Sequence, residues 1–317
     1  MKPQILVVSP MPPRVIEALK DDYDLHDYYR AEDRPALLAT VGSQVRGYLS
    51  QGAVGGADAA LMDATPNLEI IANWAVGYDT IDDQAARERG VILTNTPDVL
   101  TECCADLGMA LMLAVARRVA EGDRYVRAGR WPQKGRFELG VKVSGRRLGI
   151  IGLGRIGKAA AWRAEAFGMP VAYHGRHAQT GVTYDYHDSA VSLAENCDFL
   201  MLTCPGGPET HHLVNADVLE ALGPEGFLIN ISRGSVVDEP SLIAALSEGR
   251  IAGAALDVYE DEPRVPDALI AMENVVLQPH HGSGTTDTRR AMDDLVVENI
   301  RRHFAGEPVK TPVYPLP

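Results

Sequence analysis

In the first part of the chain, short apolar runs alternate with segments whose apolar residues recur every three or four positions. The apolar runs predict buried β-strands, and the periodic segments predict amphipathic helices. Because each predicted helix separates two predicted strands, the pattern favours βαβ crossovers and a parallel sheet. Strands are predicted at 5–9, 45–49, 68–74 and 91–94, and helices at 13–20, 57–62 and 82–89.

The same alternation returns after a long helical segment that begins near Thr101. Pro97 precedes this segment and suits a hinge, because proline cannot continue a helix. A chain of 317 residues is long enough for two domains with separate cores. We therefore expect an α/β protein with two doubly wound parallel-sheet domains. Further strands are predicted in the run before Gly152 and at 169–174, 199–203, 226–232, 252–259 and 275–278, with a last helix at 287–304.

Three spaced glycines follow the apolar run at 147–151 and open a helical pattern. In this context of strand, turn and helix, G-x-G-x-x-G predicts a dinucleotide site. Gly152 permits the tight turn, Gly154 lets the backbone approach a pyrophosphate, and Gly157 lets helix and strand pack closely. The backbone amides near Arg155 and Ile156 would then face the anion at the helix start.

The end of the next predicted strand indicates which dinucleotide binds. An acidic residue there would bind a free ribose 2′-hydroxyl and repel a 2′-phosphate. This chain has Gly175 and Arg176 instead, and a guanidinium pairs well with phosphate. We therefore expect NADP(H) to be preferred, with weaker binding of NAD(H). The alternative is a glycine turn followed by a solvated arginine.

Composition narrows the possible partners. The formal net charge of −13 argues against nucleic acid or an anionic membrane surface as a partner, because both would repel the chain. No apolar run approaches the length of a membrane span or a signal peptide, so we expect a cytoplasmic protein. The four cysteines lack metal-type spacing, and no metal site is expected.

Three polar blocks each begin where a predicted strand ends. The carboxyl ends of parallel strands lie along one edge of a sheet, beside the crevice where ligands bind. A cation, carboxylates and an imidazole can therefore converge at that edge. The blocks are 230–234 (Asn-Ile-Ser-Arg-Gly), 257–263 (Asp-Val-Tyr-Glu-Asp-Glu-Pro) and 279–285 (Pro-His-His-Gly-Ser-Gly-Thr).

With these blocks, the chain resembles the D-isomer-specific 2-hydroxyacid dehydrogenase family, and within it the glyoxylate/hydroxypyruvate reductase branch. The resemblance covers essentially the whole chain. It implies a discontinuous, flavodoxin-like substrate domain formed by 1–97 and 287–317, and a Rossmann nucleotide-binding domain at 98–286. Besides the glycine turn and the three blocks, the matching motifs are 76–79 (Val-Gly-Tyr-Asp), 95–102 (Asn-Thr-Pro-Asp-Val-Leu-Thr-Glu) and 129–131 (Gly-Arg-Trp).

The resemblance also implies that Arg233, Glu262 and His280 are catalytic. Protonated His280 would give a proton to the substrate carbonyl oxygen. Glu262 would accept the other imidazole N–H and stabilise the imidazolium. Arg233 would hold the substrate carboxylate, with the backbone amides near Val76 and Gly77 completing the anion site.

Three further positions follow from the same resemblance. Asp257 would orient the nicotinamide carboxamide. Trp131 would lie at the substrate pocket across the interface of a homodimer. His281 departs from the family pattern, which usually has an apolar residue there, and this affects local packing more than chemistry.

The leading hypothesis is an NADPH-dependent reductase that converts glyoxylate to glycolate and hydroxypyruvate to D-glycerate. One alternative is a related dehydrogenase acting on a bulkier 2-oxo acid. Another is a cofactor-sensing protein similar to a corepressor, although sensing alone would not require the complete set of Arg233, Glu262 and His280.

Overall fold

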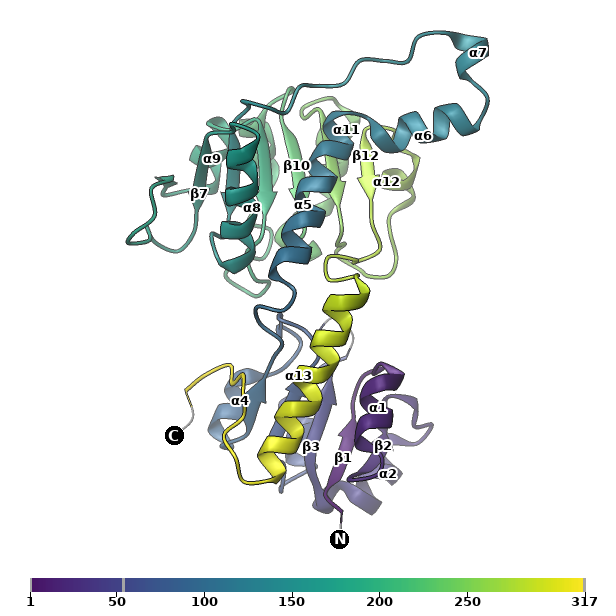
Figure 1. Ribbon diagram of the computed structural model, residues 1–317, viewed down its shortest axis with the longest axis vertical. Coiled ribbons are helices and arrows are strands. Elements are labelled where there is room, and N and C mark those ends of the chain that lie inside the picture. Colours follow the sequence, from purple (N-terminus) through teal and green to yellow (C-terminus); the bar gives the residue numbers. More distant parts are fainter. Residues whose placement is uncertain (1, 53–54, 316–317) are drawn as a thin grey trace. The chain divides into compact units, whose positions relative to one another are not determined.

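The computed structural model describes residues 2–52 and 55–315, and the chain divides into two compact units. Unit 1 comprises the residues up to Leu100 and those from Gly284 onward, and unit 2 runs from Thr101 to Ser283. Every pair of named strands is parallel, and helices pack on both sheets (Figure 1). The predicted α/β class with two parallel-sheet domains is confirmed. The outer limits of the predicted substrate domain, residues 1 and 317, lie outside the described ranges.

Unit 1 contains a sheet of five strands in the order β2-β1-β3-β4-β5, which is the flavodoxin-like order. Its central strands are almost entirely buried, so they lack the polar alternation of a half-exposed sheet. The strands are β1 (Gln4–Val7), β2 (Asp24–Asp27), β3 (Val45–Ser50), β4 (Ile70–Asn73) and β5 (Ile92–Thr94).

Aspartates fix the start of three helices in unit 1. The side chains of Asp33, Asp58 and Asp82 each accept a hydrogen bond from the amide three residues later, which satisfies a donor at the helix N-terminus. These helices are α2 (Arg34–Val41), α3 (Ala59–Asp63) and α4 (Asp83–Glu88), and α1 (Pro13–Leu19) begins with proline instead.

The last helix, α13 (Thr286–Phe304), returns to unit 1 and packs against α1 and β4. Trp74, just after β4, donates its indole N–H to Asp293 on this helix at 2.8 Å. Beyond the helix, the amide of Val313 donates to the carbonyl of Leu93 at 2.8 Å. The C-terminal segment therefore completes the core of the N-terminal unit.

Unit 2 has seven strands in the order β12-β11-β10-β9-β6-β7-β8. Counted from β6, this is the Rossmann order with one strand added at the far edge. Neighbouring residues of a strand enter different cores: Ile150 packs under α5 and α8, whereas Ile151 packs under α9, α10 and α11. The strands are β6 (Leu148–Ile151), β7 (Val171–His174), β8 (Asp185–His187), β9 (Phe199–Leu202), β10 (Phe227–Asn230), β11 (Gly253–Leu256) and β12 (Val275–Leu277).

Helices cover both faces of this sheet (Figure 1). On one face, α5 packs against α8 and against three strands of the sheet. The helices are α5 (Thr101–Ala116), α8 (Arg155–Ala166), α9 (Ala190–Glu195), α10 (Ala216–Leu222), α11 (Glu239–Ser247) and α12 (Asp267–Ala271).

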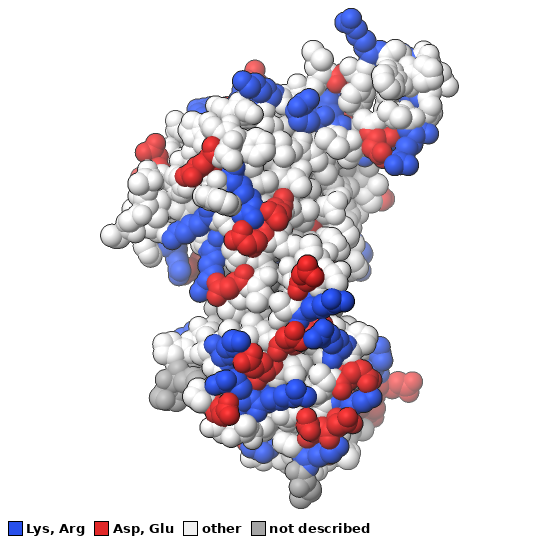
Figure 2. Space-filling view, viewed as in Figure 1, with Lys and Arg blue, Asp and Glu red and all other residues white. Residues whose placement is uncertain are grey.

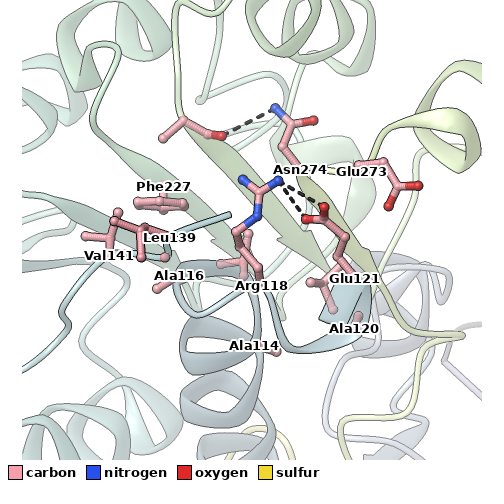
Figure 3. A pocket seen from close by; sticks show the side chains of 14 residues that line it. Ala114, Ala116, Arg118, Ala120, Glu121, Leu139, Val141, Phe227, Glu273 and Asn274 are labelled. Carbon is pink, nitrogen blue, oxygen red and sulfur yellow. Dashed lines mark hydrogen bonds and ion pairs between the residues drawn. The ribbon is translucent and has the colours of Figure 1, made fainter. Parts of the chain in front are cut away.

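An arm extends from the end of α5 and carries α6 (Val119–Arg127) and α7 (Trp131–Lys134) (Figure 1). Arg118 adopts a left-handed conformation with φ of 53° at the start of the arm, and its guanidinium pairs with Glu121 at 2.8 Å. Figure 3 shows this pair at a pocket beside the end of α5, where the arm begins. The residues that line this pocket include none of the predicted site residues.

The sequence analysis missed two strands, β2 and β8, and extended several predicted strands one to three residues beyond the observed ends. On the face drawn in Figure 2, acidic and basic side chains are interspersed on each unit. Among the described residues, no helix is long and apolar enough to span a membrane.

Candidate active site

The glycine turn joins β6 to α8. Gly152 has a φ of 95°, and a Cβ there would lie 2.5 Å from the backbone nitrogen of Cys204. A Cβ on Gly157 would lie 2.4 Å from the carbonyl oxygen of Gly152. Gly154 differs, because its Cβ would meet no atom within 4 Å. Two of these glycines therefore allow close packing, while Gly154 leaves open space above the turn.

Helix α8 begins directly at this open space. Its first intrahelical hydrogen bond runs from the amide of Lys158 to the carbonyl of Gly154, at 2.9 Å. The amides of Arg155, Ile156 and Gly157 precede that bond, at the positive end of the helix dipole. These residues fit the phosphates of a dinucleotide, which bind well at such a helix start.

Gly175 and Arg176 follow β7, the neighbour of β6 in the sheet. Arg176 is exposed, and a Cβ on Gly175 would meet no atom within 4 Å. The loop folds back toward the glycine turn, because the amide side chain of Gln179 donates to the carbonyl of Leu153 at 2.8 Å. Arg176 therefore lies on a loop that is anchored to the candidate phosphate site.

His280 and Glu262 are brought together at the opposite half of the same sheet. His280 Nδ1 lies 2.7 Å from Glu262 Oε2, and the other oxygen, Oε1, accepts the Tyr259 amide at 3.1 Å. The side chains of His280 and Glu262 are 33% and 27% exposed. Burial acts to raise the pKa of Glu262, but the bonds from His280 and Tyr259 and the nearby charge of Arg233 outweigh it and lower that pKa. Glu262 is therefore a carboxylate at neutral pH.

A buried carboxylate shapes the turn that carries His280. Asp257 is 1% exposed and accepts the amides of His281 at 2.6 Å and Gly282 at 2.8 Å. The backbone carbonyl of Asp257 accepts the His280 amide, and His280 itself has a φ of 52°. Burial raises the pKa of Asp257 despite these amide bonds. Asp257 thus holds the histidine in an uncommon backbone conformation.

The loop that carries Arg233 lies beside this pair because of two packing features. After β10, the Asn230 side chain accepts the amide and hydroxyl of Ser232 and donates to the carbonyl of Arg233 at 2.9 Å. A Cβ on Gly234 would lie 1.9 Å from the carbonyl atoms of Tyr259. Only glycine permits this approach, so the arginine loop lies directly against the loop that carries Glu262.

Val76 and Gly77 belong to unit 1, where side-chain amides hold their peptides. Asn95 donates to the carbonyl of Val76 at 2.9 Å, and Asn73 donates to the carbonyl of Gly77 at 2.8 Å. The amide of Thr96 donates to the carbonyl of Ala75 at 3.0 Å. In a planar trans peptide the N–H points opposite to the C=O. The amides of Val76 and Gly77 share their peptides with the carbonyls of Ala75 and Val76, so they are directed away from Thr96 and Asn95.

Two observations were not predicted from the sequence. A pocket borders the His280–Glu262 pair, and Tyr259 lines it while donating its hydroxyl to the carbonyl of Gln278. Tyr259 has no distinguishing sequence signal, since buried tyrosines are common. The second observation is that Trp131, on the arm, is 62% exposed.

Comparison with known proteins identifies relatives over nearly the full length. Residues 109–282 match the NAD-binding domain of the D-isomer-specific 2-hydroxyacid dehydrogenases. The chain is 49% identical, over 98% of both chains, to a hydroxyphenylpyruvate reductase of Plectranthus scutellarioides and to glyoxylate/hydroxypyruvate reductase A of Arabidopsis thaliana.

Solved structures agree with these sequence relatives. An NADPH-dependent glyoxylate/hydroxypyruvate reductase of Sinorhizobium meliloti, in complex with NADP and malonate, superposes with a TM-score of 0.91. It is 44% identical over 99% of this chain and 97% of that chain. A 2-hydroxyacid dehydrogenase of Ketogulonicigenium vulgare gives a TM-score of 0.92 at 46% identity over all of both chains. The chain belongs to the D-isomer-specific 2-hydroxyacid dehydrogenase family, and within it to the glyoxylate/hydroxypyruvate reductase branch.

Proposed function

We propose that this protein reduces glyoxylate to glycolate and hydroxypyruvate to D-glycerate, with NADPH as the preferred cofactor. The observation that carries the proposal is the 2.7 Å contact between His280 and Glu262, with the Arg233 loop packed against the Glu262 loop. A proton donor, a carboxylate that supports it and a cation are the groups that reduction of a 2-oxo acid requires.

The residues of the candidate site divide the proposed reaction among them. Arg233 binds the substrate carboxylate and polarises the carbonyl, and the amides of Val76 and Gly77 complete the anion site. NADPH, when bound, supplies the hydride. His280, protonated and held at Nδ1 by Glu262, donates a proton from Nε2 to the carbonyl oxygen.

Asp257 and the glycine turn position the reactants. The Asp257 carboxylate orders the turn that carries His280 and would orient the nicotinamide carboxamide. Gly154 would leave room for the pyrophosphate, while Gly152 and Gly157 allow the close packing that shapes the turn.

A steady-state screen of 2-oxo acids tests the substrate assignment. We expect higher kcat/KM for glyoxylate and hydroxypyruvate than for pyruvate or branched 2-oxo acids, each measured with NADPH and with NADH. Apolar bulk discriminates by only about 1–3 kcal/mol, so weaker activity with neighbouring substrates is expected. A second candidate substrate is hydroxyphenylpyruvate, because the relative named for it is as similar as the glyoxylate/hydroxypyruvate reductase. A preference for this aromatic acid would replace the leading assignment.

Arg176→Ala is expected to lower kcat/KM with NADPH by about 10–100-fold and to leave NADH nearly unchanged. The guanidinium would contact only the 2′-phosphate, and a charge-assisted hydrogen bond contributes about 1.5–3 kcal/mol. Arg176→Lys is the matched control, since it keeps the charge without the bidentate fork and should lose less. Equal losses with both cofactors would contradict the role of Arg176.

We propose a homodimer formed around residues 101–130, with Trp131 contributing to the partner's substrate pocket. Large apolar side chains are exposed on α6 and on the segment after α7. Val119 is 57% exposed, Val126 56% and Leu139 93%. Val126→Asp should yield a monomer of low activity in sedimentation velocity and kinetic assays. Ile270→Asp, at a site that is 60% exposed on α12, should remain dimeric. A wild-type protein that is monomeric and fully active would contradict the proposal.

A further inference from the structure

A second cluster of ligating side chains lies in unit 2 outside the proposed active site. One potential ligand atom from each of His211, His212 and Glu260 falls within 4.8 Å of the other two. His212 Nε2 lies 2.8 Å from Glu260 Oε1. The two imidazole rings are stacked, with centroids 3.9 Å apart. No metal site was predicted from the sequence, since the four cysteines lack metal-type spacing. This cluster has no such spacing either, because Glu260 is 48 residues away from His212.

The backbone directs both histidines to the same side. Successive residues of an extended strand point to opposite faces. Here His212 has a φ of 49°, and this left-handed conformation lets the two rings stack. The turn is anchored, since the His212 amide donates to the carbonyl of Ser235 at 2.8 Å and the Thr210 hydroxyl donates to the carbonyl of Pro205 at 2.8 Å. The two imidazoles are therefore presented together before any ligand binds.

Negative charge surrounds Glu260. Glu239 lies near enough that its side-chain oxygen accepts the Glu260 amide at 3.4 Å. Asp261 is paired with Arg264 at 2.8 Å, which neutralises only part of this charge. A cation bound beside Glu260 would relieve the remaining repulsion.

We propose that His211, His212 and Glu260 form a binding site for a divalent transition-metal ion, with Zn²⁺ as the best match. Two imidazoles and one carboxylate are ligands that zinc prefers, and three protein ligands leave one position for water. Zinc–ligand bonds are about 2.0–2.2 Å long, so ligand atoms must approach to within roughly 3–3.5 Å of one another. His211 is exposed and can make this small adjustment.

The site would connect two loops that each follow a strand of the unit 2 sheet. His211 and His212 follow β9, whereas Glu260 lies on the loop that also carries Glu262. An ion bound to all three residues would cross-link these loops in the folded state alone. Metal binding should therefore stabilise the protein against unfolding.

Isothermal titration of the chelator-treated full-length protein with ZnCl₂ tests the proposal. We expect one high-affinity equivalent, and a rise in Tm when zinc is present. His211→Ala should weaken binding by at least about 10-fold, since even the loss of an outer-shell partner costs about 10–100-fold. It should also abolish the rise in Tm. Glu260→Gln should weaken binding similarly.

Two controls separate this site from other histidines. His177→Ala removes an exposed histidine of unit 2 that lies outside the cluster and should bind zinc as the wild type does. His211→Ala should retain wild-type 2-oxo acid reduction, which shows that it is folded. Undiminished zinc binding by His211→Ala would place the ion elsewhere, for example at His280 and Glu262, and would overturn the proposal. Absence of zinc binding by the wild type would overturn it as well.

Discussion

His280→Ala is expected to lower kcat for 2-oxo acid reduction by about 10²–10⁴-fold, the usual contribution of a positioned general acid. The imidazole is held at Nδ1 by Glu262, so only its other nitrogen can deliver a proton to substrate. The loss should appear in kcat with little change in cofactor affinity, because nothing in the proposed role of His280 binds NADPH. Stopped-flow reduction assays and cofactor fluorescence titration measure the two effects separately.

The backbone at His280 requires a second variant. Its φ of 52° is unfavourable for alanine and better tolerated by asparagine. His280→Asn should therefore match His280→Ala in lost turnover while preserving thermal stability more closely. His281→Ala is the matched control, since the Asp257 carboxylate binds the backbone amide of His281 and not its ring. Near-normal turnover in both His280 variants would show that another group is the acid.

The parallel sheets were predictable because their central strands are continuous apolar runs. Ile70–Asn73 and Phe199–Leu202 are buried at every position, and such runs stand out between helical segments. The two missed strands, Asp24–Asp27 and Asp185–His187, are edge strands with no fully buried residue. Each of these strands pairs with only one neighbour and lies at the edge of its sheet, where its side chains are less buried. Its sequence therefore need not be apolar.

The sequence predicted which residues form the candidate site and that each of them follows a strand. Arg233, Glu262 and His280 all follow strands of one parallel sheet, which places them at the same edge. Their actual contacts depend on features without a periodic signal. The Arg233 loop can approach Tyr259 because residue 234 lacks a Cβ.

Contacts that belong to no recognised motif were not predictable from the sequence. The proximity of Glu260 to His211 and His212 depends on the register of the loops after β9 and β11, which no local pattern encodes. Asp257 was assigned to the cofactor through family resemblance, yet both of its oxygens also accept backbone amides of the His280 turn. A buried carboxylate needs such donors, but the sequence does not say which amides supply them.

Glu262→Gln is expected to move the alkaline limb of the reduction profile to lower pH by about one unit or more. Glu262 Oε2 lies 2.7 Å from His280 Nδ1, so the carboxylate pairs with the imidazolium that donates the proton. Glutamine no longer stabilises the imidazolium, so the proton donor is lost at lower pH. A charge-assisted hydrogen bond contributes about 1.5–3 kcal/mol, and about 1.4 kcal/mol corresponds to one pH unit.

The stability of the same variant at acidic pH supplies an independent check. Because the folded-state pKa of Glu262 lies below its ordinary value of 4.5, the carboxylate stabilises the fold above that pH. This stabilisation is lost as the pH falls through the lowered pKa. Glu262→Gln should therefore be less stable than wild type at neutral pH, with a difference that narrows below about pH 4.5. Asp261→Asn, on the same loop but paired with Arg264, should leave the alkaline limb in place. An unshifted limb in Glu262→Gln would mean that this carboxylate does not support the proton donor.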